Sequence, residues 1–312
     1  MINVLIIDQM HDSIVPMLKG IGINPDYRPD ITAEEVHELL PNYEGLILRS
    51  KMKVKVDLLE KAPRLKFVAR AGAGVDEIDN DYLDKRNITL LNAPEGNCDA
   101  VGEHALGILL CLMNNLHTGD REVRAKKWRR EANRGYELHT RTVGIIGYGN
   151  MGQAFAKRLK GFGCEVLAYD NVKTGYSDEF AKEASLEELH GQADVLSFHI
   201  PLNDYNKYLV DEEYLGKFKK PLYLINLARG EIMKLKTIKW ALETGKVTAA
   251  GLDVLENEKL QTLTTEQEVI FDWLAEQDNV LFSPHVGGWT FESYERINKV
   301  LTEKIDKLLN KA

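Results

Sequence analysis

Three glycines and one acid in the middle of the chain have the spacing of a dinucleotide-binding site. Gly147, Gly149 and Gly152 follow the apolar run 143–146 and open a helical segment, and Asp170 ends the next strand-like run. In such a unit the glycines permit a tight turn, close approach of a pyrophosphate and close packing of the helix, whose first amides face the phosphates. Asp170 is expected to accept hydrogen bonds from both hydroxyls of a ribose and to repel a 2′-phosphate. The sequence therefore predicts an NAD site, with a purely structural glycine turn as the alternative.

Three residues nearer the C-terminus suit the chemistry that takes place beside a nicotinamide ring. Hydride transfer to a ketone needs an acid for the developing alkoxide and a cation that holds the substrate. His285 suits the first role because an imidazole changes its charge near neutral pH, and Arg229 suits the second because a guanidinium matches a carboxylate bidentately. Glu258 is the carboxylate expected to orient His285 and to favour its protonated form. For an isolated histidine or arginine, the alternative is a surface or core role.

These residues must be positioned by strands, because all of them follow strand-like runs. The runs are continuous in apolar character and alternate with helix-like segments, which is typical of a parallel sheet covered on both faces. Ligands of such sheets bind beyond the carboxyl ends of the strands. The strand-like runs are residues 3–8, 45–48, 65–69, 88–92, 143–146, 165–169, 194–200, 222–226, 248–252 and 279–282. The helix-like segments include residues 33–40, 56–61, 80–85, 100–130 and 294–309.

The long helical stretch 100–130 separates two α/β units, so a domain boundary is expected near Asn97. We predict two Rossmann-like or flavodoxin-like domains with doubly wound parallel sheets, and we expect the closing helix to pack back on the first domain. The far end of the long stretch, residues 121–134, is rich in arginine and lysine around Trp128. We interpret this end as a solvated helix end or a subunit contact, with anion binding as the alternative.

The composition of the 312 residues is that of a globular protein of about two domains. A net charge of −8 argues against a general nucleic-acid binder. No apolar run is long enough for a membrane span and the start of the chain lacks the layout of a signal peptide, so we expect a cytoplasmic protein with no membrane partner. Cys98, Cys111 and Cys164 are too few and too scattered for disulfides or a zinc site, and no metal site is expected.

Six short motifs spread over nearly the whole chain carry a resemblance to a known family. They are G-L-I-L-R-S at 45–50, A-R-A-G-A-G-V-D at 69–76, the glycine turn at 147–152, N-L-A-R-G at 226–230, G-L-D-V-L-E-N-E at 251–258 and S-P-H-V-G-G at 283–288. With these motifs the chain resembles the NAD-dependent D-2-hydroxyacid dehydrogenases, and within them it is most similar to short D-3-phosphoglycerate dehydrogenases.

The resemblance implies a role for each motif. Arg229, Glu258 and His285 are implied to be catalytic. The substrate would be bound at Arg49, Ser50, Ala71, Gly72, Ala73 and Gly74. The backbone amides around Ala71 to Gly74 would hold its carboxylate. The cofactor NAD would be bound at Gly147, Gly149, Asn150, Met151, Gly152, Asp170, His199, Pro201, Leu227, Ala228, Asp253, His285, Gly287 and Gly288.

The resemblance also implies a domain organisation. Residues 1–97 and 289–312 would form a discontinuous substrate domain, and residues 98–288 a Rossmann domain that binds NAD. A homodimer would be built around the long helix. No regulatory domain follows position 312, so feedback control by such a domain is not expected.

Several stretches depart from the pattern of that family. After Glu258 the family has proline, whereas this chain has Lys259 and then a longer segment, residues 260–277, in the same loop. After Gly230 the family has a glycine and an acidic pair, whereas this chain differs over residues 231–236. Lys51 and Lys53 stand where phosphoglycerate enzymes carry small residues. These lysines favour either a phosphorylated or dianionic substrate or a merely solvated loop, and the pattern leaves both open.

The predicted function is NAD-dependent interconversion of a 2-oxo acid and a D-2-hydroxy acid, similar to that of D-3-phosphoglycerate dehydrogenase. A glyoxylate or hydroxypyruvate reductase is an alternative within the same chemistry. A different alternative is an NADH-responsive binding protein, like the corepressors that share this fold. Turnover of a panel of 2-oxo acids would separate an enzyme from a binding protein.

Overall fold

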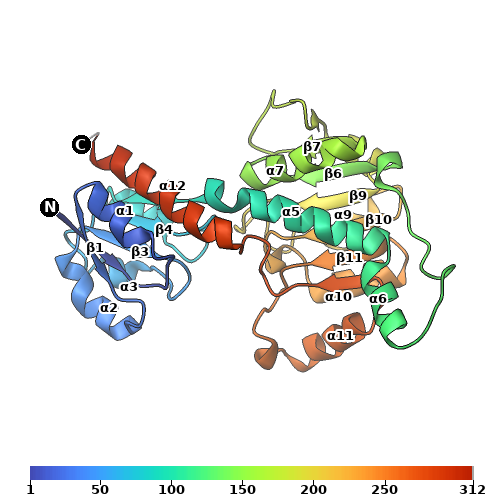
Figure 1. The fold of residues 1–312 in the computed structure, drawn as a ribbon, viewed down its shortest axis with the longest axis horizontal. Helices are drawn as coiled ribbons and strands as arrows, with labels where there is room; N and C mark the ends of the chain where they lie inside the picture. Colours follow the sequence, from blue (N-terminus) through green and yellow to red (C-terminus); the bar gives the residue numbers. More distant parts are fainter. Residues whose placement is uncertain (311–312) are drawn as a thin grey trace. The chain divides into compact units, whose positions relative to one another are not determined.

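A computed structural model describes residues 1–310, so Lys311 and Ala312, the end of the predicted segment 289–312, lie outside the described residues. The chain divides into two compact units (Figure 1). The first comprises Met1–Cys98 and the chain from Trp289 onward, and the second is Asp99–Gly288. Each unit is a parallel sheet covered by helices, which confirms the predicted fold class of two doubly wound sheets.

The first unit contains a five-stranded parallel sheet in the order β2-β1-β3-β4-β5. This is the flavodoxin-like order. Its strands are β1 (Ile2–Ile6), β2 (Ile23–Tyr27), β3 (Gly45–Leu48), β4 (Phe67–Arg70) and β5 (Thr89–Asn92). Sequence analysis missed the edge strand β2, because Pro25 and Asp26 give it the composition of a loop; an edge is where a sheet tolerates proline.

Helices cover both faces of this sheet. They are α1 (Ile14–Gly20), α2 (Ala33–Leu39), α3 (Val56–Leu59), α4 (Asn80–Lys85) and α12 (Phe291–Leu309). The last helix lies beside α1 (Figure 1), and Asn298 of α12 donates a hydrogen bond to the carbonyl of His11 at 3.0 Å. Ile297, Leu301 and Ile305 recur every four residues and are buried against the sheet. This apolar stripe explains why the end of the chain returns to the first unit.

The second unit contains a seven-stranded parallel sheet in the order β12-β11-β10-β9-β6-β7-β8. The order reverses between β6 and β9, which is the Rossmann pattern. The strands are β6 (Thr142–Ile146), β7 (Glu165–Tyr169), β8 (Lys182–Glu183), β9 (Val195–Phe198), β10 (Leu222–Asn226), β11 (Val247–Leu252) and β12 (Val280–Phe282). The helices are α5 (Pro94–Met113), which begins in the first unit, α6 (Leu116–Arg124), α7 (Asn150–Leu159), α8 (Leu186–Gln192), α9 (Glu212–Gly216), α10 (Leu235–Glu243) and α11 (Thr265–Ala275).

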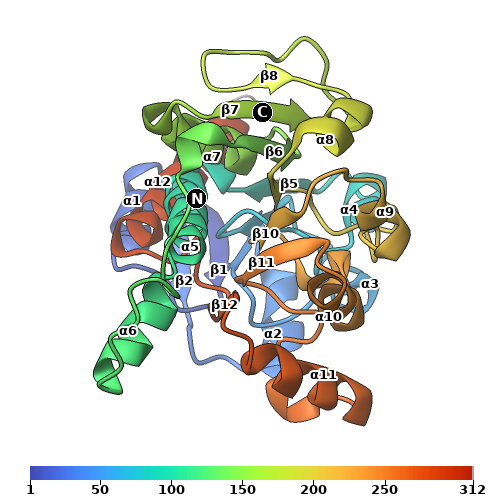
Figure 2. The same ribbon diagram turned by 90° about the vertical axis from the view of Figure 1, so that its right-hand side faces the viewer.

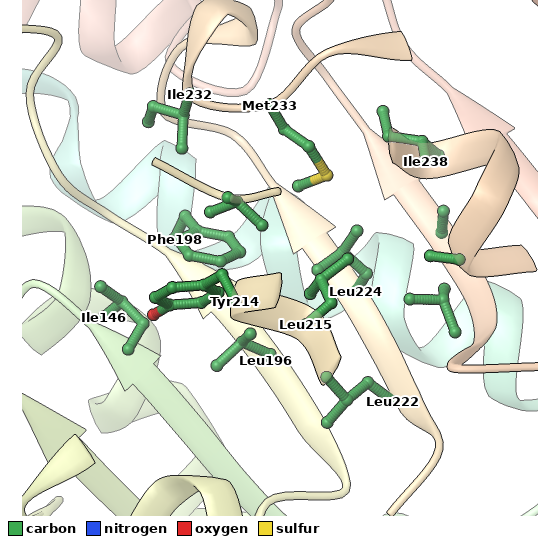
Figure 3. Packing of buried hydrophobic residues seen from close by; sticks show 14 of the residues in the cluster. Ile146, Leu196, Phe198, Tyr214, Leu215, Leu222, Leu224, Ile232, Met233 and Ile238 are labelled. Carbon is green, nitrogen blue, oxygen red and sulfur yellow. The ribbon is translucent and has the colours of Figure 1, made fainter. Parts of the chain in front are cut away.

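Two apolar cores hold the helices to the sheet of the second unit. Side chains of α5 and α7 form one core, and side chains of α8, α9, α10 and α11 form the other. The ribbons of α5 and α7 lie on one side of the sheet and those of α8, α9 and α10 on the other (Figure 2). In the second core Phe198 of β9 packs beside Tyr214 of α9, and Leu196 and Leu224 belong to the same cluster (Figure 3). The two cores fix the strands, whose carboxyl ends carry the predicted site residues.

The predicted single helix over residues 100–130 is wrong. The helix α5 begins earlier, at Pro94, and is followed after a break by α6, which ends at Arg124. Asn115 lies at the break with φ 51°, in the left-handed region that asparagine tolerates better than most residues. Across residues 1–310, none of the helices is both long and apolar enough to traverse a bilayer.

Candidate functional site in the second unit and its supporting loops

The glycine turn is closed on one side and open on the other. A Cβ atom at Gly147 would lie 2.6 Å from the carbonyl oxygen of His199, and one at Gly152 would collide with the carbonyl oxygen of Gly147. A Cβ atom at Gly149 would meet nothing within 4 Å. The helix α7 begins at Asn150 without a side-chain cap, so its first amides have no intrahelical acceptor. The turn therefore offers free N–H groups and open space, which is what a pyrophosphate requires.

Asp170 lies next to this turn, and its carboxylate already accepts three hydrogen bonds from backbone amides. Its Oδ2 atom accepts a hydrogen bond from the amide of Tyr148 at 2.8 Å, and its Oδ1 atom accepts from the amides of Val172 and Lys173 at 2.9 and 3.0 Å. Burial raises the pKa of this carboxyl, but the three N–H donors and the nearby charge of Lys173 outweigh burial, so the pKa of Asp170 lies below its ordinary value. Asp170 is thus an ionised acceptor at neutral pH.

His199 directly follows β9, and its carbonyl oxygen lies against Gly147 of the glycine turn. Its ring lies 5.6 Å from that of Phe155, and its Nε2 atom is 2.9 Å from the hydroxyl of Ser197. Burial lowers the pKa of His199 to about 4, so the ring is neutral at neutral pH. Pro201, two residues further on, is exposed, and its carbonyl accepts a hydrogen bond from Asn206 at 2.8 Å.

Asp253 organises the loop that carries the predicted catalytic histidine. Its carboxylate is buried and accepts hydrogen bonds from the hydroxyl of Ser283 at 2.6 Å and from the amides of Val286 and Gly287 at 2.9 and 2.8 Å. A Cβ atom at Gly287 would lie 2.9 Å from this carboxylate and 3.0 Å from the side chain of Leu227. The structure therefore brings three predicted cofactor residues, Leu227, Asp253 and Gly287, into one cluster.

His285 and Glu258 form a pair at the surface of the second unit. The Nδ1 atom of His285 lies 2.9 Å from Oε1 and 3.0 Å from Oε2 of Glu258. The backbone of His285 has φ 54°, an uncommon conformation for a residue other than glycine, and its amide donates to the carbonyl of Asp253 at 2.8 Å. Because Nδ1 faces the carboxylate of Glu258, Nε2 is the ring nitrogen that this pair does not use. The neighbouring acid, Glu256, accepts instead from the amide of Leu235 at 2.9 Å.

Arg229 follows β10 in extended conformation and is half-buried. Its guanidinium donates to the carbonyl of Ala228 at 2.7 Å, and its own carbonyl accepts from the side chain of Asn226 at 3.0 Å. The next residue, Gly230, packs so closely on the backbone of Leu255 that any side chain there would collide. The loops after β10 and β11 therefore support each other.

The sheet explains how separate loops gather. Strands β10, β11 and β12 are neighbours, with Asn226 opposite Leu252 and Leu252 opposite Phe282. Arg229, Glu258 and His285 follow the carboxyl ends of these three strands, so all three lie at one edge of the sheet.

The predicted substrate residues lie in two loops of the first unit. The amides of Arg49 and Ser50 both donate to the Oδ2 atom of Asp8, at 2.7 and 3.2 Å, and so are not free. In the second loop, within the described part of the chain, the amides of Ala73 and Gly74 have no protein acceptor.

The other residues of these two loops contact the protein itself. The amides of Ala71 and Gly72 donate to backbone carbonyls at 2.7 and 2.9 Å. The guanidinium of Arg49 stacks on the ring of Trp289, with its carbon 3.7 Å from the ring centroid. Lys51 donates to the carbonyls of Pro29 and, at 3.1 Å, Ile31. Lys51 therefore ties its loop to the segment that contains Pro29 and Ile31.

Sequence analysis missed several residues that shape the site. Asp8 ends the predicted strand-like run 3–8 and lies two residues after β1, so the strand-end rule that selected the other residues was a sufficient signal for it. His104, whose Nε2 atom lies 2.9 Å from the hydroxyl of Ser283, is on α5 and gave no local signal. Tyr148 is buried and donates to Asp178 at 3.0 Å, a partner that the spacing of the glycines does not reveal.

Residues 106–287 match the NAD binding domain of the D-isomer specific 2-hydroxyacid dehydrogenase family. A hydroxypyruvate reductase from Thermotoga maritima is 34% identical over 276 residues, which cover 88% of each chain. A D-3-phosphoglycerate dehydrogenase from Methanocaldococcus jannaschii is 31% identical over 312 residues, which cover 99% of this chain and 58% of that one.

The fold has a solved relative. The crystal structure of D-lactate dehydrogenase from Aquifex aeolicus, complexed with NAD and lactic acid, superposes with a TM-score of 0.84 at 28% identity and covers 99% of this chain and 96% of that one. The present chain spans little more than half the length of the phosphoglycerate dehydrogenases that it matches. With a family match over residues 106–287 and a relative that is 34% identical over 88% of each chain, this chain belongs to the D-isomer specific 2-hydroxyacid dehydrogenase family.

Proposed function

We propose that the protein is an NAD-dependent oxidoreductase that interconverts a 2-oxo acid and a D-2-hydroxy acid. The observation that carries this proposal is the pair of His285 and Glu258, which stands at the strand ends of a domain whose glycine turn suits a pyrophosphate. In this proposal residues 98–288 bind the cofactor, and residues 1–97 with the segment from 289 onward bind the substrate.

His285 is the acid of the proposed reaction. A bound NADH supplies the hydride, or NAD takes it up in the reverse direction. The Nε2 atom of protonated His285 donates its proton to the oxygen at C2 of the 2-oxo acid, and neutral Nε2 takes it back from the hydroxy acid. Glu258 accepts from Nδ1–H, which fixes the tautomer and stabilises the imidazolium.

Two groups are proposed to bind the substrate, each in its own unit: the guanidinium of Arg229 in the second unit and backbone amides of the 71–74 loop in the first. Of the amides in that loop, Ala73 and Gly74 are the two without a protein acceptor in the described part of the chain. Successive N–H groups without an acceptor suit an anion, and a guanidinium suits a carboxylate because it donates bidentately. Arg49, held by its stack on Trp289, is proposed to contact the rest of the substrate.

The preferred substrate is proposed to be a three-carbon 2-oxo acid with an oxygen substituent at C3. 3-Phosphohydroxypyruvate is the first candidate, because relatives over nearly the whole chain are named D-3-phosphoglycerate dehydrogenase. Hydroxypyruvate is the second candidate, because the match to the hydroxypyruvate reductase covers 88% of both chains. Lys51 also favours it, since its ammonium is bound to backbone carbonyls and is not available to a phosphate.

We also propose a homodimer that uses α5 and α6. The exposed apolar side chains of this region support it, since Leu116 is 59%, Val123 52% and Trp128 79% exposed. Such side chains are enriched at interfaces between subunits. Light scattering coupled to size exclusion should give twice the mass of the chain, and Trp128→Glu with Val123→Glu should give a monomer.

The activity is tested by NADH oxidation with 3-phosphohydroxypyruvate, hydroxypyruvate, glyoxylate and pyruvate. His285→Ala should lower kcat by about 100-fold or more, the usual contribution of a positioned general acid. Glu258→Gln should also lower kcat, whereas Glu256→Gln, which keeps an acceptor for Leu235, is the matched control and should not. Near wild-type turnover by His285→Ala would refute the assignment. Tight NADH binding without turnover of any of the four acids would favour the NADH-responsive binding protein.

A further inference from the structure

Tyr148, the second residue of the glycine turn, is held by three side chains that follow β7. Its amide donates to Asp170 at 2.8 Å, and its carbonyl accepts from the ammonium of Lys173 at 3.0 Å. Its buried hydroxyl donates to both carboxylate oxygens of Asp178 at 3.0 Å. The place expected to take the adenosine ribose therefore contains a fixed cation, Lys173, as well as the predicted acid.

The acid alone does not have enough free acceptors for the ribose. A carboxylate has about four lone-pair positions, and three of those on Asp170 are filled by the amides of Tyr148, Val172 and Lys173. Oδ1 accepts two of these bonds and Oδ2 accepts one, so the position that remains is on Oδ2. The adenosine ribose of NAD has two hydroxyls, and Asp170 can accept from one of them.

Lys173 has the donors that the second hydroxyl needs. An ammonium carries three N–H groups, and one of those on Lys173 is bound to the carbonyl of Tyr148. That bond fixes the ammonium beside the turn, although Lys173 itself is exposed. Its charge contributes to the lowered pKa of Asp170, so the two groups are within electrostatic reach of each other.

We propose that Lys173 is a second ribose-binding residue of the NAD site, donating to the ribose oxygen that Asp170 does not serve. The same ammonium offsets the repulsion between Asp170 and a 2′-phosphate. The site therefore prefers NADH but still binds NADPH measurably. An aspartate without a neighbouring cation would prevent NADPH binding. This inference rests on the NAD site of the proposed function and makes Lys173 a determinant of cofactor selectivity.

A purely structural lysine would behave differently. If Lys173 only braced Tyr148, removing its charge would weaken NADH and NADPH by the same factor. Lys173→Gln keeps an N–H that can reach the carbonyl of Tyr148 but loses the charge, and Lys173→Arg keeps the charge. Lys182→Gln is the matched control, because it removes one exposed positive charge from β8 of the same unit.

The experiment is a fluorescence titration of the full chain with NADH and with NADPH, without substrate. Lys173→Gln should raise the Kd of NADPH by about tenfold or more and that of NADH by about threefold or less, since the ammonium loses a pair with an anionic phosphate in the first case and a bond to an uncharged hydroxyl in the second. Lys173→Arg and Lys182→Gln should change both constants by less than about twofold.

Three results would overturn the proposal: equal weakening of both cofactors by Lys173→Gln, the same effect from Lys182→Gln, or no binding of NADPH by the unmodified chain. The binding readout also separates this inference from the activity. A chain that binds NADH but turns over none of the acids contradicts the proposed function, whereas the comparison between NADH and NADPH still decides the role of Lys173.

Discussion

Acid is expected to destabilise the second unit through His199, whose ring is packed against Phe155 at the end of β9. Burial lowers the pKa of His199 from 6.5 to about 4. In the unfolded chain this histidine binds a proton as the pH falls below 6.5, while the folded chain stays neutral down to about 4. The unfolded state therefore binds more protons over this window, and the free energy of unfolding falls as the pH falls.

The magnitude follows from the two pKa values. At 1.36 kcal/mol for each unit of pKa, the full loss is about 3 kcal/mol, reached only below the folded pKa. Between a pH of about 7.5 and a pH of about 5, linkage predicts a loss of ~2 kcal/mol from this residue. Well above a pH of 6.5 neither state binds this proton, so His199 causes no loss in the free energy of unfolding.

The assay is urea unfolding followed by circular dichroism at both pH values, for the unmodified chain and for His199→Asn. Asparagine keeps a polar group beside Ser197 but does not titrate. The difference in the free energy of unfolding between the two proteins should therefore change by ~2 kcal/mol between the two pH values, because other titrating groups cancel. Ser197→Ala, which removes the 2.9 Å contact with the ring, should retain the pH dependence, since burial is its cause.

Two results would refute this reasoning. One is a difference between the proteins that changes by less than about 0.5 kcal/mol, which is near the error of the extrapolation. The other is a nuclear magnetic resonance titration in which the ring of His199 gains its proton near 6.5.

Further predictions concern the glycine turn and the loop that holds the catalytic histidine. Gly152→Ala should lower the free energy of unfolding by about 1–3 kcal/mol in urea, because its methyl group collides with the carbonyl of Gly147; an unchanged midpoint would contradict the close packing. Gly149→Ala should keep that midpoint but weaken NADH binding in a fluorescence titration, because its methyl group enters the open side of the turn. Asp253→Asn should cost about 1–3 kcal/mol and lower kcat, because the NH2 group of the amide cannot accept a hydrogen bond, which leaves one of the three donors, Ser283 or the amides of Val286 and Gly287, without its acceptor; full activity and stability would show that the loop does not depend on this carboxylate.

Much of the fold and of the candidate site could be predicted from the sequence, because the patterns that indicate them involve residues close together in the chain. Parallel strands buried on both faces must be continuous in apolar character, so most strands were predicted near their observed bounds. The glycines at 147, 149 and 152 and the polar residues after β10, β11 and β12 were visible for the same reason: each depends on a few adjacent residues. The break between α5 and α6 at Asn115 was not predicted, because the composition of residues 100–130 indicated one continuous helix.

Most hydrogen-bond partners were beyond the sequence, because they depend on how loops close over residues that are distant in the chain. Sequence analysis named Glu258 as the partner of His285, and the structure has that pair, but only the structure shows that the neighbouring Glu256 accepts from the amide of Leu235. In the same way, only the tertiary structure shows that three amides occupy most of the Asp170 carboxylate and that Lys173 stands beside it. The sequence by itself determined the two α/β units and the residue types at their strand ends, whereas the hydrogen-bond partner of each of those residues was decided by the folded loops.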